Sequence, residues 1–160
     1  MPGQNQPAAN AVLGVQFQYI KDLSFESPNA PQIFATASGA PPAIEMGVNI
    51  ATKRMEGGAT HEVVLMLKLD AKIAGKTALI AELAYAGLFA LPPGLPEESQ
   101  KRLLLIECPF LLFPFARAIL ANAVREGGFP QILIHPIDFA ALYDANKDNI
   151  SPIAAPAGHA

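Results

Sequence analysis

The sequence predicts an α+β domain in which helices cover one face of a four-stranded antiparallel sheet. Three observations lead to this fold class. Four segments alternate apolar and polar residues with a period of two, short turns join the last three of them, and a long apolar segment follows. The chain has 160 residues, the size of one domain. We expect a disordered lead over 1–11, one domain over 12–149 and a mobile tail over 150–160.

The first strand is predicted from Val15 to Glu26. Two prolines in the segment Ser27-Pro28-Asn29-Ala30-Pro31 end it, because proline lacks the backbone donor of a ladder. Residues 32–42 are predicted to form a crossover loop. Within the strand, alternation predicts one buried face made of Val15, Phe17, Tyr19, Leu23 and Phe25.

The next three strands are predicted to form an antiparallel meander. The second strand alternates over 44–51, the third over 63–70 and the fourth over 77–89. The turn Glu56-Gly57-Gly58-Ala59 separates the second from the third strand, and Ala74-Gly75-Lys76 separates the third from the fourth. Turns this short allow only antiparallel neighbours.

The most informative segment is Leu103 to Val124, in which 17 of 22 residues are apolar. It is long enough for a membrane span, but Glu107 and Arg117 lie inside it, and charges are costly there. Wound as a helix it is apolar on almost every side, so it must be covered on more than one side. We favour a soluble helix between two layers over a membrane element, and expect the second layer to be another subunit.

Prolines and glycines predict where the helical part changes direction. Pro109 and Pro114 each remove an intrahelical hydrogen bond, so we expect a break near Cys108-Pro109 and a bend near Pro114. Gly127-Gly128 is predicted to end the helix. Residues 129–136 then form an extended link, and Asp138 is predicted to cap a short helix that carries Phe139, Leu142 and Tyr143 on one face.

Composition excludes several classes of protein. Hydrophobic residues make up 51% of the chain, charged residues only 16%, and the net charge is −3. No run of Lys or Arg is present to follow phosphates, so a nucleic-acid partner is not expected. The N-terminal residues lack the pattern of a secretory signal, and one cysteine excludes an internal disulfide. A cytoplasmic protein is the simplest expectation.

The sequence offers no candidate for catalysis. The three histidines and one cysteine are not arranged in any metal-ligand spacing, and no phosphate-binding or nucleophile motif is present. Cys108 lies in an apolar segment that should raise its pKa, and this is typical of a buried structural cysteine. We therefore expect no enzymatic activity, no metal and no cofactor.

Carboxylates on the polar face of the sheet are the remaining signal. Asp22 and Glu26 have the same parity in the first strand, and Glu82, with Ile80 beside it, would join them if the first and fourth strands pair. Two interpretations stay open on pattern alone. The acids either keep a solvated face soluble or form a docking patch with an apolar anchor.

Two segments resemble the SecB protein-export chaperone family. They are KDLSFESPNAP (Lys21–Pro31) and ECPFLLFPFARAILANAVREGGFPQILIHPIDFAALY (Glu107–Tyr143). The resemblance covers about residues 12–147. It implies a dimer of dimers whose long helices lie between two sheets. It also implies a cytoplasmic holdase, without enzymatic activity, that keeps presecretory proteins unfolded and delivers them to the motor ATPase SecA.

The resemblance also assigns residues. By motif match, it places the contacts with SecA on Asp22, Glu26, Ile80 and Glu82. For the homotetramer interface we expect Leu83, Tyr85, Leu112, Phe113, Ala116 and Ile119. Tyr85 departs from the family, in which a smaller polar residue is common there, so the packing between dimers is open.

Clients are expected in an apolar groove between the helical layer and the crossover loop. The candidates are the large apolar side chains Phe34, Phe139, Leu142 and Tyr143, and the alternative is that all four are simply core. Two other functions stay open. A hydrophobic small-molecule binding protein or hydrolase would use the apolar interior as a pocket, and a purely structural oligomer would bind no unfolded chain.

Overall fold

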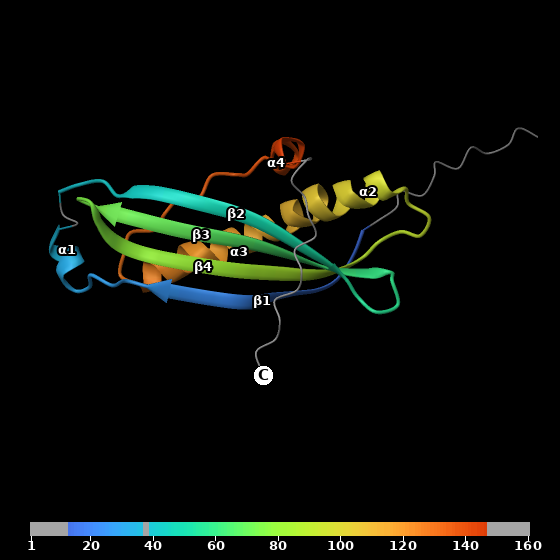
Figure 1. Ribbon diagram of the computed structural model, residues 1–160. Helices are drawn as coiled ribbons and strands as arrows, with labels where there is room; N and C mark the ends of the chain where they lie inside the picture. Colours follow the sequence, from blue (N-terminus) through green and yellow to red (C-terminus); the bar gives the residue numbers. More distant parts are fainter. Residues whose placement is uncertain (1–12, 37–38, 147–160) are drawn as a thin grey trace, which may run out of the picture.

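The computed structural model describes residues 13–36 and 39–146. The predicted N-terminal lead over 1–11 and the predicted tail over 150–160 lie outside the described residues. Four long strands and a nearly continuous helical stretch make up most of the described chain. Figure 1 shows the helix α3 lying across one face of the sheet.

The sheet contains β1 (Gly14–Glu26), β2 (Ala43–Arg54), β3 (Thr60–Ile73) and β4 (Lys76–Ala90). The strand order is β1-β4-β3-β2, and every neighbouring pair is antiparallel. The predicted meander of the last three strands is confirmed. The pairing of the first strand with the fourth, on which the acidic face depended, is also present.

The two predicted hairpin turns are present, and both use backbone conformations with positive φ. Gly57 and Gly58 have φ of 89° and 79° in the β2–β3 turn. The two-residue β3–β4 turn places Ala74 at 52° and Gly75 at 78°. Turns of this hand match the right-handed twist of the strands, so they set the registers of both hairpins.

The helical part begins at α2 (Glu97–Arg102), continues through a π-helical turn, η1 (Leu103–Glu107), and then through α3 (Cys108–Glu126). The predicted break near Cys108-Pro109 is therefore wrong, because the helix continues. The N–H of Cys108 donates to the carbonyl of Leu103, five residues earlier, and Pro109 falls in the first turn of α3. A missing N–H costs little at that position.

The predicted helix end and the predicted cap of the short helix are confirmed, whereas the bend near Pro114, which lies inside α3, stays a prediction. α3 ends before Gly127, and Gly128 follows with φ of 91°. Asp138 caps α4 (Phe139–Ala145) and accepts a hydrogen bond of 3.0 Å from the N–H of Ala141. The crossover between β1 and β2 contains one element that pattern alone did not predict, the short helix α1 (Gln32–Thr36).

The core lies between α3 and the two central strands. Leu112, Ala116 and Leu120 of α3 are fully buried, as are Val63 and Leu65 of β3. A Cβ atom at Gly87 of β4 would lie 2.6 Å from the ring of Phe89 and 3.0 Å from the side chain of Leu112, so glycine leaves room here for both side chains to pack under α3. The face of the sheet that packs on α3 is called the inner face below, and the opposite face is called the outer face.

The predicted buried face of β1 is wrong, because two bulges interrupt its alternation. The register with β4 shifts at Gln16 and again at Lys21, and each extra residue moves the following side chains to the opposite face. Val15, Leu23 and Phe25 share the inner face with Phe89, Leu83 and Ala81. Phe17 and Tyr19, however, pair with Leu88 and Ala86 on the outer face. Phe17 is 67% exposed there.

A polar cluster holds β1 at the second bulge. Tyr19 donates a hydrogen bond to one carboxylate oxygen of Glu62 on β3, and the ammonium of Lys21 lies 2.7 Å from the other oxygen. Burial raises the pKa of the Glu62 carboxyl. The hydrogen bonds from Lys21 and Tyr19 and the charges of Lys21 and Lys53 outweigh this, so the net pKa is below its ordinary value. Burial and Glu62 together raise the pKa of Tyr19 to about 12.

Glu62→Gln should destabilise the fold by about 1–3 kcal/mol at pH 7, because it removes the charge of a buried carboxylate that accepts hydrogen bonds from Tyr19 and Lys21. The pKa of Glu62 is lowered in the folded chain. Its contribution is therefore fully present above the ordinary value of 4.5 and is lost as the pH falls through the lower folded value. Urea unfolding at pH 7 and at pH 3 measures both effects, with Glu56→Gln in the exposed β2–β3 turn as control. An equal loss of stability at both pH values would contradict the assignment.

Candidate functional site

The titratable groups inside the fold are unsuited to catalysis. Cys108 is fully buried, and burial together with the charge of Glu107 raises the pKa of its thiol to about 12. Burial and the charge of Arg54 lower the pKa of His61, which keeps that imidazole neutral at pH 7. Within residues 13–36 and 39–146, no group of three His, Cys, Asp or Glu side chains is placed to hold a metal ion.

The long helix has one buried side and one uncovered side. The stretch Glu97–Glu126 is long and apolar enough to cross a membrane by length and composition, as core helices of soluble proteins also are. One side of α3 is buried against the sheet, whereas Leu111 is 40% exposed and Phe115 is 52% exposed. A single chain therefore leaves part of this apolar helix open to solvent.

Most of the residues predicted for the oligomer interface lie inside the single chain. Leu83, Leu112, Phe113 and Ala116 are buried in its own core, and Ile119 is half-buried. Tyr85 stacks on Phe115, with ring centroids 6.4 Å apart, and donates a hydrogen bond to the side-chain oxygen of Gln18. The interface itself stays a prediction.

The four candidate client residues do not form one surface. Phe34 of α1 is 41% exposed and packs on Phe129, with ring centroids 5.1 Å apart, next to the end of α3. Phe139 and Tyr143 of α4 are buried, and Phe139 packs edge-on against Phe113. Leu142 is half-buried. Phe34 is thus the most exposed of the four and the best placed to contact another chain.

The outer face carries an ordered group of acids, which we call the acidic patch. Strand pairing arranges its residues in three rows that each cross all four strands. Asn49, Met66, Ala84 and Asp22 form the first row; Gly47, Lys68, Glu82 and Ser24 form the second; Glu45, Asp70, Ile80 and Glu26 form the third. Five carboxylates and a single cation, Lys68, occupy these twelve positions.

The patch brings together all four residues predicted to dock SecA: Asp22, Glu26, Ile80 and Glu82. Sequence reasoning missed Glu45, Asp70 and Lys68, which complete it from β2 and β3. The signal was available, because the short turns on either side of β3 set the registers that place Glu45 opposite Asp70 and Lys68 opposite Glu82. The acids therefore extend across the whole width of the sheet.

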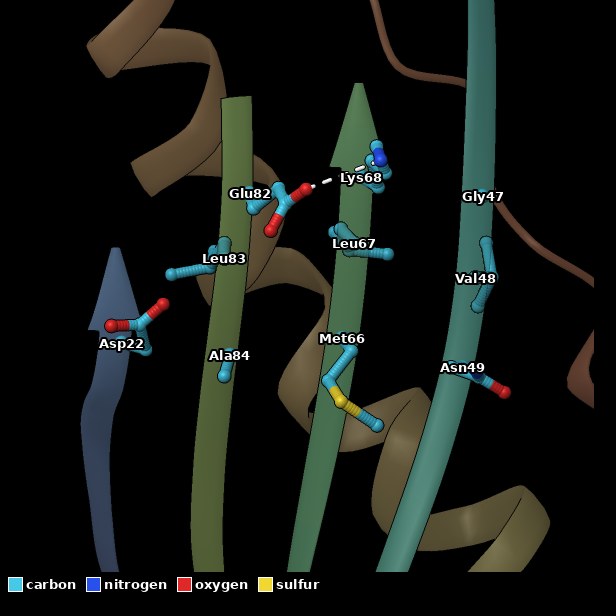
Figure 2. A pocket seen from close by; sticks show the side chains of 10 residues that line it. All are labelled: Asp22, Gly47, Val48, Asn49, Met66, Leu67, Lys68, Glu82, Leu83 and Ala84. Carbon is cyan, nitrogen blue, oxygen red and sulfur yellow. Dashed lines mark ion pairs between the residues drawn. The ribbon is translucent and has the colours of Figure 1, made fainter. Parts of the chain in front are cut away.

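A hollow of about 360 Å³ opens between the first two rows of the patch. Figure 2 shows it from the outer side, with Asp22 at one edge, Asn49 at the other and Met66 between them. The ammonium of Lys68 lies 3.3 Å from the carboxylate of Glu82, and both side chains are about half exposed. This hollow lies on the outer face and not in the apolar interior, which the small-molecule hypothesis would use.

Comparison with known proteins identifies the family. A family model for the preprotein translocase subunit SecB matches residues 5–149. The chain belongs to the SecB family. It is 48% identical over 148 residues to the protein-export protein SecB of Granulibacter bethesdensis, covering 88% of this chain and 85% of that protein. It is 51% identical over 133 residues to the SecB of Paramagnetospirillum magneticum, covering 83% and 84%.

A solved structure shares the fold. A SecB-like chaperone of Mycobacterium tuberculosis, solved in complex with an antitoxin peptide, matches with a TM-score of 0.66 at 13% identity. The match covers 78% of this chain and 90% of that one. The resemblance drawn from the two motifs is therefore confirmed, and so are the α+β fold and the role of a protein-export chaperone that is not an enzyme.

Proposed function

We propose that this SecB protein is a cytoplasmic holdase that keeps presecretory proteins unfolded and delivers them to SecA. The observation that carries the proposal is the separation of chemistry between the two faces of one sheet. The helix side carries the exposed apolar side chains of Phe34 in α1 and of Leu111 and Phe115 in α3, whereas the acidic patch lies on the outer face. One face can thus hold a client while the other contacts the motor.

Client holding suits the helix side because several of its exposed side chains are large and apolar. Each 1,000 Å² of apolar surface removed from water gains about 25 kcal/mol gross, and the ordering of both partners offsets much of it. Contacts of this kind give affinity with little sequence preference. Phe34, next to Phe129 and the end of α3, is the side chain that we assign to this role.

The protein should arrest the refolding of a slowly refolding presecretory protein. Phe34→Ala should weaken this arrest several-fold, because it removes an exposed aromatic ring from the helix side. Phe17→Ala is the matched control, since Phe17 is also an exposed phenylalanine but lies on the outer face. Refolding rates at several chaperone concentrations measure the effect. Equal weakening by both variants, or none by Phe34→Ala, would contradict the assignment of the client face.

The assembly we propose is a homotetramer, a dimer of dimers, in which the uncovered side of α3 meets another copy. The chain is poor in charge, and the exposed side chains of Leu111 and Phe115 form a continuous apolar side one helical turn apart. Two such sides facing each other would remove this surface from water.

Leu111→Asp should dissociate the tetramer into smaller species and leave each chain folded, because the residue is 40% exposed in the single chain. A charge placed in an apolar interface has no partner and costs several kcal/mol there. Sedimentation equilibrium gives the mass and circular dichroism the helix content. Ala59→Asp, in the exposed β2–β3 turn, is the control. A wild-type monomer at micromolar concentration, or a Leu111→Asp tetramer, would contradict the proposed interface.

Docking to SecA is assigned to the acidic patch. Reversing Asp22, Glu26 and Glu82 to lysine should weaken SecA binding by at least about tenfold, because three exposed charge interactions become repulsive. The remaining binding should respond less to salt. Arrest of client refolding and the oligomeric mass should persist, since no core contact changes. Loss of arrest with unchanged SecA affinity would show that the two faces are assigned the wrong way round.

A further inference from the structure

Lys68 is the only cation among the twelve positions of the acidic patch, and it lies at the centre of the patch. It stands on β3 in the second row, with Glu82 beside it on β4 and Asp70 two residues further along its own strand. Its ammonium pairs with Glu82 at 3.3 Å, as Figure 2 shows. A positive charge at the centre of a surface that docks a basic partner repels that partner, unless the partner displaces it from Glu82.

We propose that Lys68 competes with the docking partner for the carboxylate of Glu82. In the unbound protein its ammonium neutralises Glu82. In the complex a lysine or arginine of the partner enters the hollow and forms an ion pair with Glu82, which replaces the pair with Lys68. This inference rests on the proposed docking of SecA to the acidic patch and adds the residue that regulates it.

The geometry provides room for the exchange. Asp22 lies opposite the small Ala84 across the β1–β4 pair and Glu82 lies two residues from Ala84 on β4, so an incoming cation meets two carboxylates at one end of the hollow. Met66, in the same row as Ala84, offers an apolar surface to the stem of a long basic side chain. On the other side of Lys68, Gly47 has no side chain to fill the space.

The pair is also weak enough to open. The side chain of Lys68 is 59% exposed and that of Glu82 is 49% exposed, and ion pairs this exposed are stabilised only slightly. One carboxylate oxygen of Asp70 is buried and has no hydrogen-bond partner within the described residues. Asp70 therefore offers the displaced ammonium of Lys68 a second acceptor on the same strand and face.

The competition predicts that the patch binds more tightly without Lys68. Purified SecA is titrated into the full-length protein, wild type and Lys68→Gln, at fixed ionic strength. Lys68→Gln should tighten docking by about two- to fivefold, the range expected of an exposed ion pair. Lys76→Gln is the control, because it changes the net charge equally but lies at the start of β4 and does not line the hollow.

A double-mutant cycle separates the exchange at Glu82 from general electrostatics. In a Glu82→Gln background, Lys68→Gln should bind SecA no more tightly than Lys76→Gln does, because there is no shared carboxylate left to release. An advantage that persists in that background, or a Lys68→Gln protein that binds no better than Lys76→Gln, would overturn the proposal.

The triple reversal of Asp22, Glu26 and Glu82 distinguishes this failure from failure of the proposed function. If it weakens SecA binding while Lys68→Gln has no effect, docking to the patch stands and the competition is wrong. If wild type does not bind SecA, or the reversal changes nothing, both are wrong.

Discussion

The packing of α3 on β3 and β4 is the constraint on which the rest of the structure depends. Leu112, Ala116 and Leu120 are fully buried against central strands whose inner side chains are themselves nearly inaccessible. Gly87 leaves room for this packing, because a side chain there would meet the ring of Phe89 and the side chain of Leu112. Because the inner face of the sheet packs on this helix, the charged side chains of the central strands lie on the outer face.

The packing of α3 on the inner face explains why charged side chains lie on the outer face of the sheet. The outer face of β3 and β4 carries Lys68, Asp70 and Glu82, and antiparallel pairing brings acids from β1 and β2 into the same rows. The edge strand β1 follows the same rule only after two bulges. Its second bulge is held by the pair between Lys21 and the buried Glu62, which ties β1 to β3 across β4.

Prediction from the sequence succeeded where the signal was local. The glycines of the two hairpin turns set the order and direction of β2, β3 and β4, and Asp138 marked the start of α4. Prediction failed where one inserted residue changes the face on which the following side chains lie. The apolar and polar residues of β1 still alternate, yet the bulge at Gln16 moves Phe17 and Tyr19 to the outer face. The bulge at Lys21 then returns Leu23 to the inner face. The π-helical turn before Pro109 likewise has no sequence period of its own.

The sequence by itself determined the fold class, the apolar helix and the identity of the acids in the first and fourth strands, because periodicity, turns and motifs are properties of neighbouring residues. Only the tertiary structure decided which acids share a surface. Asp22 and Glu26 join the acids of β2, β3 and β4 because β1 pairs with β4, which is distant in the sequence, in one particular register. The register depends on both paired strands, so it cannot be inferred from the sequence of either strand alone.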